Sequence, residues 1–130
     1  MGSFTNYAEC KLLNAFAGNE VVNSISMWTG LFTAAPSDLS GGTEVTGGSY
    51  ARKSSGAWGT CTGSEGFIDN LATITFVTAT AAWGTVSHFA LLDDSSTGNM
   101  IAWATLTASR TVVTNDVAVF AIGSLTITMD

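Results

Sequence analysis

The sequence predicts a mainly β fold: an antiparallel β-sandwich or jelly roll of about seven to eight strands with one short N-terminal helix. Short runs of alternating apolar and polar residues recur at a spacing of roughly 10–15 residues, with turn-forming segments between them. No repeat of fixed period is visible, which disfavours a propeller. Only one segment has helical periodicity, and this shortage of helix argues against α/β enzyme folds.

Residues 82–107 are expected to form the centre of this fold. Residues 85–92 and 99–106 each alternate between two faces, and both faces carry apolar side chains. Between them lies the sequence DDSSTG, in which Asp and Ser side chains favour a bend and Gly98 tolerates a positive φ. Apolar residues on both faces predict a hairpin that other parts of the chain cover on each side.

The single predicted helix spans about residues 7–17. Asn6 is the expected N-cap, with Glu9 at the capping-box spacing, and Gly18 stands where a C-cap would end the helix. A helix of this length is marginal alone, so its apolar face is expected to dock on the sheets or on another subunit. The residues of that apolar face are Ala8, Leu12, Ala15 and Phe16.

The remaining strands are expected before and after the central hairpin. Pro36 ends the first of them, and residues 37–48, rich in Gly and Ser, are predicted to be a long loop of the kind that is often functional or mobile. We expect one β domain over residues 1–130, with an arm and helix at about 1–20 and the sandwich over 24–130. The runs that predict these strands are 24–33, 49–57, 71–77, 111–113, 117–121 and 125–129.

Composition excludes several classes of function. Charged residues make up 11% of the chain, against about 25% in a typical protein, and the formal net charge is -6. Four basic residues are too few for a phosphate-binding surface, so no nucleic-acid partner is expected. No apolar run approaches the roughly 20 residues of a membrane span, and no leader pattern opens the chain. We therefore expect synthesis in the cytoplasm and no membrane partner.

Catalytic motifs are missing from the sequence. It contains no G-x-S-x-G, no phosphate-binding loop and no H-E-x-x-H. His88 with Asp93 or Asp94, and Glu65 with Asp69, are conceivable acid–base pairs. A hydrogen-bonded histidine and solvated carboxylates are the favoured interpretations of these residues. We predict no catalytic residues, no cofactor and no enzymatic activity.

Metal-ligand patterns are equally weak. Cys10 and Cys61 lack the spacing of a zinc knuckle, the chain has a single His, and both cysteines are expected to be free, partly buried thiols. Residues 93–99 offer oxygen ligands of the kind that calcium uses, but they lack the spacing of a calcium-binding loop and its distal Glu. A turn stabilised by its own side chains is favoured there, and no metal site is predicted.

Four tryptophans raise the alternative of a sugar-binding platform. Trp28 and Trp103 lie in the middle of strands and are interpreted as core residues. Trp58 and Trp83 stand next to Gly at strand ends, so they are the candidates for exposed aromatic rings. Packing in the core or in an interface is favoured for all four rings.

Five motifs along the chain carry a resemblance to a known family. They read FTNYAECKLL at 4–13, LFTAAP at 31–36, GGSYAR at 47–52, AWGTVSHF at 82–89 and LTITMD at 125–130. On these motifs nearly the whole chain resembles a family of small virion structural proteins of tailed phages, described variously as tail-fibre-like, head-fibre or capsid decoration proteins. The resemblance implies a non-enzymatic protein located in the virion, and it brings no catalytic residues.

The first function expected from this resemblance is capsid decoration. Such a cement protein binds the outside of the shell and stabilises it across subunit seams, because many modest contacts add up. Its expected partners are the major capsid protein and other copies of itself, as a homotrimer. The alternatives are a tail, baseplate or fibre component, or a host-glycan-binding module that uses Trp58 or Trp83. The residues expected to contact partners are Phe4, Tyr7, Leu12, Phe16, Leu39 and Val45.

Overall fold

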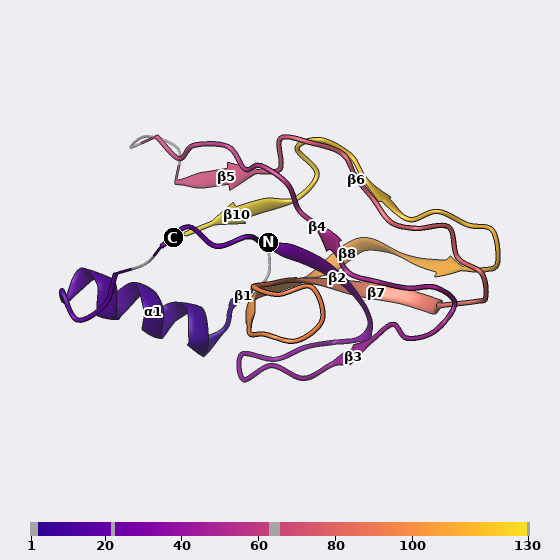
Figure 1. Ribbon diagram of the computed structural model, residues 1–130, viewed down its shortest axis with the longest axis horizontal. Helices are drawn as coiled ribbons and strands as arrows, with labels where there is room; N and C mark the ends of the chain where they lie inside the picture. The colour runs from indigo at the N-terminus through magenta and orange to yellow at the C-terminus, as the bar shows by residue number, and fades with distance from the viewer. Residues whose placement is uncertain (1–2, 22, 63–65, 130) are drawn as a thin grey trace.

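The computed structural model describes residues 3–21, 23–62 and 66–129. Within these ranges the chain forms ten strands, paired antiparallel, and one N-terminal helix, which confirms the predicted mainly β fold class (Figure 1). Their arrangement is compatible with a sandwich or jelly roll. The elements are β1 (Ser3–Phe4), α1 (Asn6–Phe16), β2 (Trp28–Ala34), β3 (Thr43–Glu44), β4 (Lys53–Ser54), β5 (Phe67–Asp69), β6 (Ile74–Thr75), β7 (Gly84–Leu92), β8 (Met100–Val112), β9 (Val119–Phe120) and β10 (Thr126–Thr128).

The largest sheet is built around the predicted central hairpin. Its strand order is β1-β8-β7-β2-β3, and β4 also pairs with β2. Leu31 of β2 lies opposite Phe89 of β7, which lies opposite Ala104 of β8, so one row of apolar side chains crosses the middle of the sheet. The second strand of the hairpin is longer than predicted, because the segment at 111–113 is largely its continuation.

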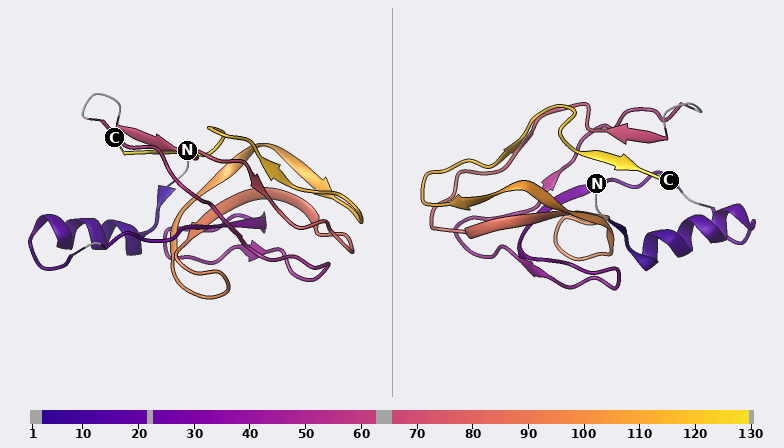
Figure 2. Two further views of the ribbon diagram at one scale, coloured as in Figure 1. Left: turned by 45° about the horizontal axis from the view of Figure 1, so that its top comes forward. Right: turned by 180° about the vertical axis from the view of Figure 1, so that it is seen from behind.

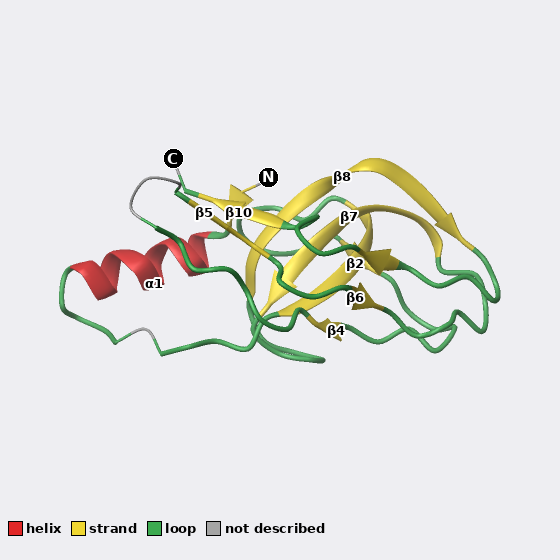
Figure 3. Cartoon of the chain, turned by 90° about the horizontal axis from the view of Figure 1, so that it is seen from above, coloured by secondary structure: helices red, strands yellow, loops and turns green. Residues whose placement is uncertain are grey.

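A large bulge interrupts the pairing of β7 with β8. Val86 pairs with Arg110 and His88 pairs with Thr105, so Ser87 alone faces the four residues 106–109. Extra residues on one strand of an antiparallel pair bend that strand and increase its twist. β8 accordingly curves over the body of the domain (Figures 2 and 3).

Two small sheets, β5 with β10 and β6 with β9, cover one face of the large sheet (Figure 3). The main apolar core lies between them and the strands β2, β7 and β8. All of its members are nearly inaccessible to solvent, and they come from both layers. They are Leu31, Val45, Ile74, Phe76, Ala79, Trp83, Val86, Phe89, Leu91, Ala104, Val112, Leu125 and Ile127.

Asn70 fastens the second layer where strand pairing is sparse. Its side chain is fully buried, and Nδ2 donates to the carbonyl oxygens of Ala72 at 2.8 Å and Ala121 at 2.9 Å. Its Oδ1 accepts from the backbone N–H of Leu125 at 2.9 Å. One satisfied amide thus joins two connecting segments that share only two- and three-residue ladders.

The edge of β2 between β3 and β4 carries a polar network centred on Glu44. Arg52 donates two parallel hydrogen bonds to the Glu44 carboxylate, each 2.8 Å long. The Tyr50 hydroxyl donates to the same carboxylate at 2.9 Å and accepts from the Leu31 backbone N–H at 2.9 Å. Burial raises the pKa of Tyr50, so its hydroxyl stays protonated and keeps donating.

Arg52 also reaches the turn of the central hairpin. Its Nη1 donates to the carbonyl oxygens of Asp94 at 3.0 Å and Thr97 at 2.6 Å. Within the turn, the Asp94 carboxylate accepts from the backbone N–H groups of Ser96 and Thr97, both at 2.9 Å. These bonds make residues 93–99 the side-chain-stabilised turn that the sequence favoured.

Residues 47–49 pass close to Trp83. The Trp83 indole Nε1 donates to the Gly48 carbonyl at 2.9 Å. Gly48 has a φ of +54°, and a Cβ added there would lie 2.7 Å from the Ala81 carbonyl oxygen and 2.9 Å from the indole ring. Only glycine fits this position without movement of its neighbours.

The helix begins one residue earlier than predicted. Thr5, not Asn6, is the N-cap, and its side chain accepts from the Ala8 backbone N–H. The Thr5 hydroxyl also donates to the carbonyl of Met100 in β8, a tertiary contact that the local sequence does not reveal. Gly18 follows the helix with a φ of +74°, in agreement with the predicted end. Within the described residues, no helix has the length and apolar character needed to cross a membrane.

Several predicted strands are shorter in the structure. The segment at 49–57 pairs only through β4, and the segment at 71–77 only through β6. The predicted loop at 37–48 contains β3, because Glu44 pairs with Phe32 of β2. These short elements form where a partner strand is available over two or three residues, and such brief pairing leaves no periodic pattern in the sequence.

We expect Gly48→Ala to destabilise the fold more than Gly47→Ala. Both positions have positive φ, which costs an L-residue about 1–2 kcal/mol, but nothing lies within 4 Å of a Cβ at Gly47. The overlap at Gly48 adds roughly 1–3 kcal/mol. Urea unfolding of the two variants gives the comparison. Equal losses of unfolding free energy in both would contradict the close approach to Trp83.

The Asp94 turn predicts a pH-dependent contribution to stability. The N–H groups of Thr97 and Ser96 lower the pKa of Asp94 to about 2 from its ordinary value of 3.8. Because this pKa is depressed in the folded state, the stabilisation is present above pH 3.8 and is lost as pH falls towards 2. The melting temperature of the wild type should exceed that of Asp94→Asn at pH 5–7, with the gap closing below pH 4. Asp38→Asn controls for the change in net charge, and a gap that does not depend on pH would disprove the assignment.

Candidate assembly surface

Helix α1 stands off from the body of the domain at one end of its long axis (Figure 1). Its first turn is anchored, because Ala8 is buried against Ile101 and Ala102 of β8. Towards its C-terminal end Leu13 is 66% exposed and Phe16 is 80% exposed. The helix therefore holds two large apolar side chains in water.

Three of the exposed side chains of α1 lie on one stripe. Glu9, Leu13 and Phe16 are spaced at i, i+4 and i+7, and all three are exposed. We call these three residues the outer stripe. Of the predicted apolar face, Ala8, Leu12 and Ala15 are buried or half-buried, whereas Phe16 is exposed and is left for the second predicted possibility, contact with another subunit.

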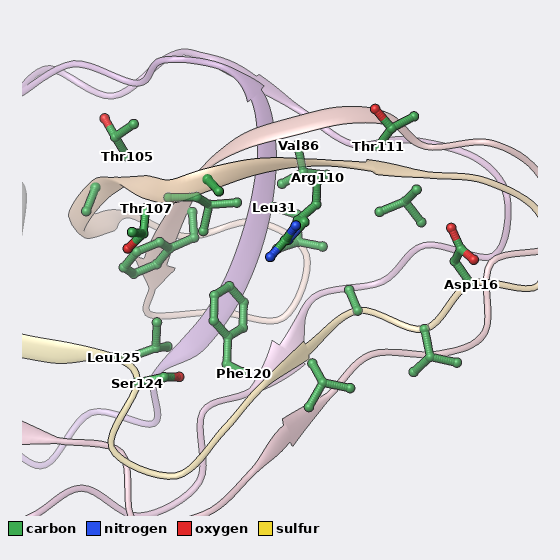
Figure 4. A pocket seen from close by; sticks show the side chains of 18 of the residues that line it. Leu31, Val86, Thr105, Thr107, Arg110, Thr111, Asp116, Phe120, Ser124 and Leu125 are labelled. Carbon is green, nitrogen blue, oxygen red and sulfur yellow. The ribbon is translucent and has the colours of Figure 1, made fainter.

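An open groove of about 780 Å³ lies between residues 104–112 of β8 and residues 116–126, and we call it the β8 groove (Figure 4). Its apolar lining includes Leu31, Phe89 and Phe120. β1 pairs with β8 only at Ala102 and Trp103, so no strand among the described residues pairs with the outer edge of β8 beyond them. The groove exists because β8 bulges and β9 pairs with β6 instead of with β8.

Two charged residues, Arg110 and Asp116, line the β8 groove. Figure 4 shows the Arg110 side chain reaching from β8 towards Phe120 on the opposite wall. Across the described ranges, Arg110 forms no ion pair with a carboxylate, whereas Arg52 and Lys11 are each paired with a glutamate. The Asp116 carboxylate accepts from the Val113 N–H at 2.9 Å, so Arg110 is the charge of the lining that is left for the carboxylate of a partner, on a chain of net charge -6. Exposed apolar residues lie in and around it: Val113, Val117, Val119 and Ile122.

Of the residues predicted to contact partners, the structure exposes two and buries or half-buries the others. Phe4, Tyr7 and Leu12 are half-buried at the base of the helix, where the Tyr7 hydroxyl donates to Asp93 Oδ2 at 3.3 Å. Phe16 and Leu39 are each 80% exposed and remain available to a partner.

Val45 requires a correction. Its side chain is 4% exposed and belongs to the main core, so it offers nothing to a partner in this fold. The cause is local: the Val45 N–H donates to the Leu31 carbonyl at 2.9 Å, which extends the pairing of β3 with β2 and turns the side chain inward. A loop assignment at 37–48 could not anticipate this pairing.

The tryptophans do not form an exposed platform. Trp83 is 5% exposed and its indole is fixed by Gly48, in agreement with the favoured interpretation as a core ring and against the alternative of an exposed ring. Trp58 is half-buried against the main core. Trp28 and Trp103, predicted as core residues, are half-buried on the large sheet.

The polar residues weighed as catalytic or metal-binding serve local hydrogen bonds. His88 Nδ1 shares a hydrogen bond with the Ser87 hydroxyl at 2.7 Å, and Asp93 Oδ1 accepts from the Asn99 N–H at 2.6 Å. Glu65 lies outside the described residues, so its pairing with Asp69 is not tested. In the ranges that the structure describes, no group of three or more His, Cys, Asp or Glu is arranged to hold a metal ion. Both cysteines are free, but contrary to expectation both are exposed.

Sequence reasoning missed Leu13, Arg110 and the β8 groove. The signal for Leu13 was present, since it lies three residues before Phe16 and thus on the same side of a helix. The groove had no such signal, because it depends on a register shift between β7 and β8 that alternation within one strand does not encode.

Comparison with known proteins places the chain in a family. A search of curated proteins gave no match. The model of one protein family matches residues 3–128, and that family is described as Podophage GP4 fiber I protein gp80. The match covers nearly the whole chain and agrees with the resemblance carried by the five sequence motifs. The chain therefore belongs to the podophage GP4 fiber I protein gp80 family, a family of phage virion structural proteins.

Proposed function

We propose that this protein is a non-enzymatic subunit of a phage fibre, built into the virion through contacts between copies and with neighbouring virion proteins. The observation that carries the proposal is the apolar surface left exposed at separate places on one folded domain. Leu13 and Phe16 lie on a projecting helix, and a second group surrounds the β8 groove. Large exposed apolar patches on soluble domains mark interaction sites.

The polar composition of the chain also supports an assembly role. With 11% charged residues, the domain has little charge with which to coat an isolated surface. The ion pair of Glu44 with Arg52 lies against the sheet and joins segments of the same chain. His88, Asp93 and Asp94 are each engaged in local hydrogen bonds, which is the environment of structural residues.

Capsid decoration is the second candidate, with the major capsid protein as partner. It is favoured by the same surfaces, because a domain with apolar groups at two places can bridge two neighbours across a shell. The family description favours a fibre. A homotrimer suits either role and is tested below through the contacts between copies. A host-glycan-binding module is less well supported, since Trp83 is buried and Trp58 is half-buried.

Gold-labelled antibodies raised against the purified chain should bind phage particles at discrete projecting fibres in electron micrographs. Particles from phage that lack the chain, with labelling at the background level, are the control. Labelling spread evenly over the head, together with reduced heat resistance of the mutant heads, would favour capsid decoration. Intact particles that never bind the antibody would contradict both virion roles.

A further inference from the structure

We propose that helix α1 of one copy docks in the β8 groove of a second copy, so that copies join head to tail. This inference rests on the proposed function as a fibre subunit and names the contact that assembles it. The donor is the outer stripe of Glu9, Leu13 and Phe16. The acceptor is the groove lined by Arg110, Phe120 and the valines beside them.

The helix lacks the support that its length requires. Isolated helices shorter than about 12–15 residues are marginal in water, and α1 has 11 residues. Its own chain fully buries only the first turn, where Thr5 and Ala8 contact β8, and it leaves Leu12 and Ala15 half-buried. A partner that covers Leu13 and Phe16 would remove from water the largest apolar side chains on the helix.

The shape of the β8 groove suits side chains of a helix better than an added strand. The residues 106–109 bulge out of register with β7, so the outer edge of β8 does not offer a regular row of hydrogen-bonding groups. The groove is open and about 780 Å³ in volume, within the roughly 300–1,000 Å³ of pockets that bury small ligands. Amphipathic helices commonly dock in apolar grooves through anchors at i and i+3, which is the spacing of Leu13 and Phe16.

The charge of Arg110 favours the outer stripe of α1 as the segment that occupies the groove. Arg110 is unpaired among the described residues and reaches into the groove, so an occupant that brings a carboxylate is favoured. Glu9 is exposed and lies about 6 Å along the helix axis from Leu13 and about 10 Å from Phe16. Lys11, the one cation on the helix, is paired with Glu20 away from the outer stripe. Glu9 of the outer stripe can therefore pair with Arg110, while Leu13 and Phe16 meet the apolar lining of the groove.

The positions of donor and acceptor make the contact one between copies. α1 projects from one end of the domain, and β8, whose residues 104–112 line the groove, runs away from the helix towards the other end (Figure 1). A helix anchored by Thr5 to β8 cannot reach the groove of its own chain. Because the two surfaces differ, a pair of copies retains one free helix and one free groove, and the assembly either closes as a ring or continues as a filament. A ring of three copies would account for a homotrimer.

Sedimentation velocity of the purified full chain over a range of concentrations tests the contact. The wild type should self-associate, and Phe16→Ser, Arg110→Glu and Glu9→Arg should each raise the dissociation constant at least tenfold. The double variant Glu9→Arg with Arg110→Glu should recover association, because the ion pair is restored in reverse. Lys53→Glu, the same charge change at an exposed site on β4, is the matched control and should leave association unchanged.

A mixing experiment separates this contact from pairing of like helices. Phe16→Ser retains an intact groove and Arg110→Glu retains an intact helix, so an equimolar mixture should form one-to-one heterodimers that neither variant forms alone. Circular dichroism confirms folding of each variant, since all three substituted positions are exposed.

Three results would overturn the inference: a wild type that stays monomeric at every concentration, association lost in Phe16→Ser but unchanged in Arg110→Glu, or no complementation on mixing. None of these results affects the antibody labelling of virions. Failure of the helix–groove contact and failure of the fibre assignment are therefore distinguishable.

Discussion

The Glu44 carboxylate connects β3 at the edge of the large sheet with residues 50–52 and, through Arg52, with the turn of the central hairpin. No strand pairing joins these three segments to one another. The carboxylate accepts from Arg52 and Tyr50, and through them it is linked to the Leu31 N–H and to the carbonyls of the hairpin turn. The pair is only partly exposed, so loss of either partner would leave the other charge poorly solvated against the sheet. In a chain with four basic residues, the use of one for this contact shows how much the fold relies on it.

Connections of this kind are needed because the second layer has so little backbone pairing. β5, β6, β9 and β10 each contain two or three residues. The Asn70 amide, the Trp83 indole and the Arg52 guanidinium each bond to backbone carbonyls of distant segments. Side chains thus satisfy polar groups that a longer sheet would pair through its backbone. The five motifs of the family resemblance contain several of these residues, including Gly48, Tyr50, Arg52 and Trp83.

How much of the structure the sequence could predict depends on how far apart in the sequence the contacting residues lie. The central hairpin was predictable because alternation persists over eight residues on each side of a polar turn. The N-cap was misplaced by one residue because the Thr5 hydroxyl is committed to β8, which lies about a hundred residues away in the chain. Val45 and Trp83 looked like loop and strand-end residues, and only the pairing of β3 and the close approach of Gly48 bury them. Of the candidate surface, Phe16 and Leu39 were identified from the sequence, whereas Arg110 gained its significance from a bulge that no local pattern encodes.

The anchoring of α1 at its base has a mechanical consequence. The backbone N–H of Thr5 donates to Ile101 and that of Asn6 donates to Asp38, both at 2.9 Å, so the first turn is fixed to the sheet by the main chain as well as by the buried hydroxyl. The helix therefore keeps its direction relative to the sheet, although its C-terminal end is exposed to solvent. The helix is therefore preorganised: its orientation is set before any encounter, and little rotational freedom of the backbone remains to be lost when the tip is captured.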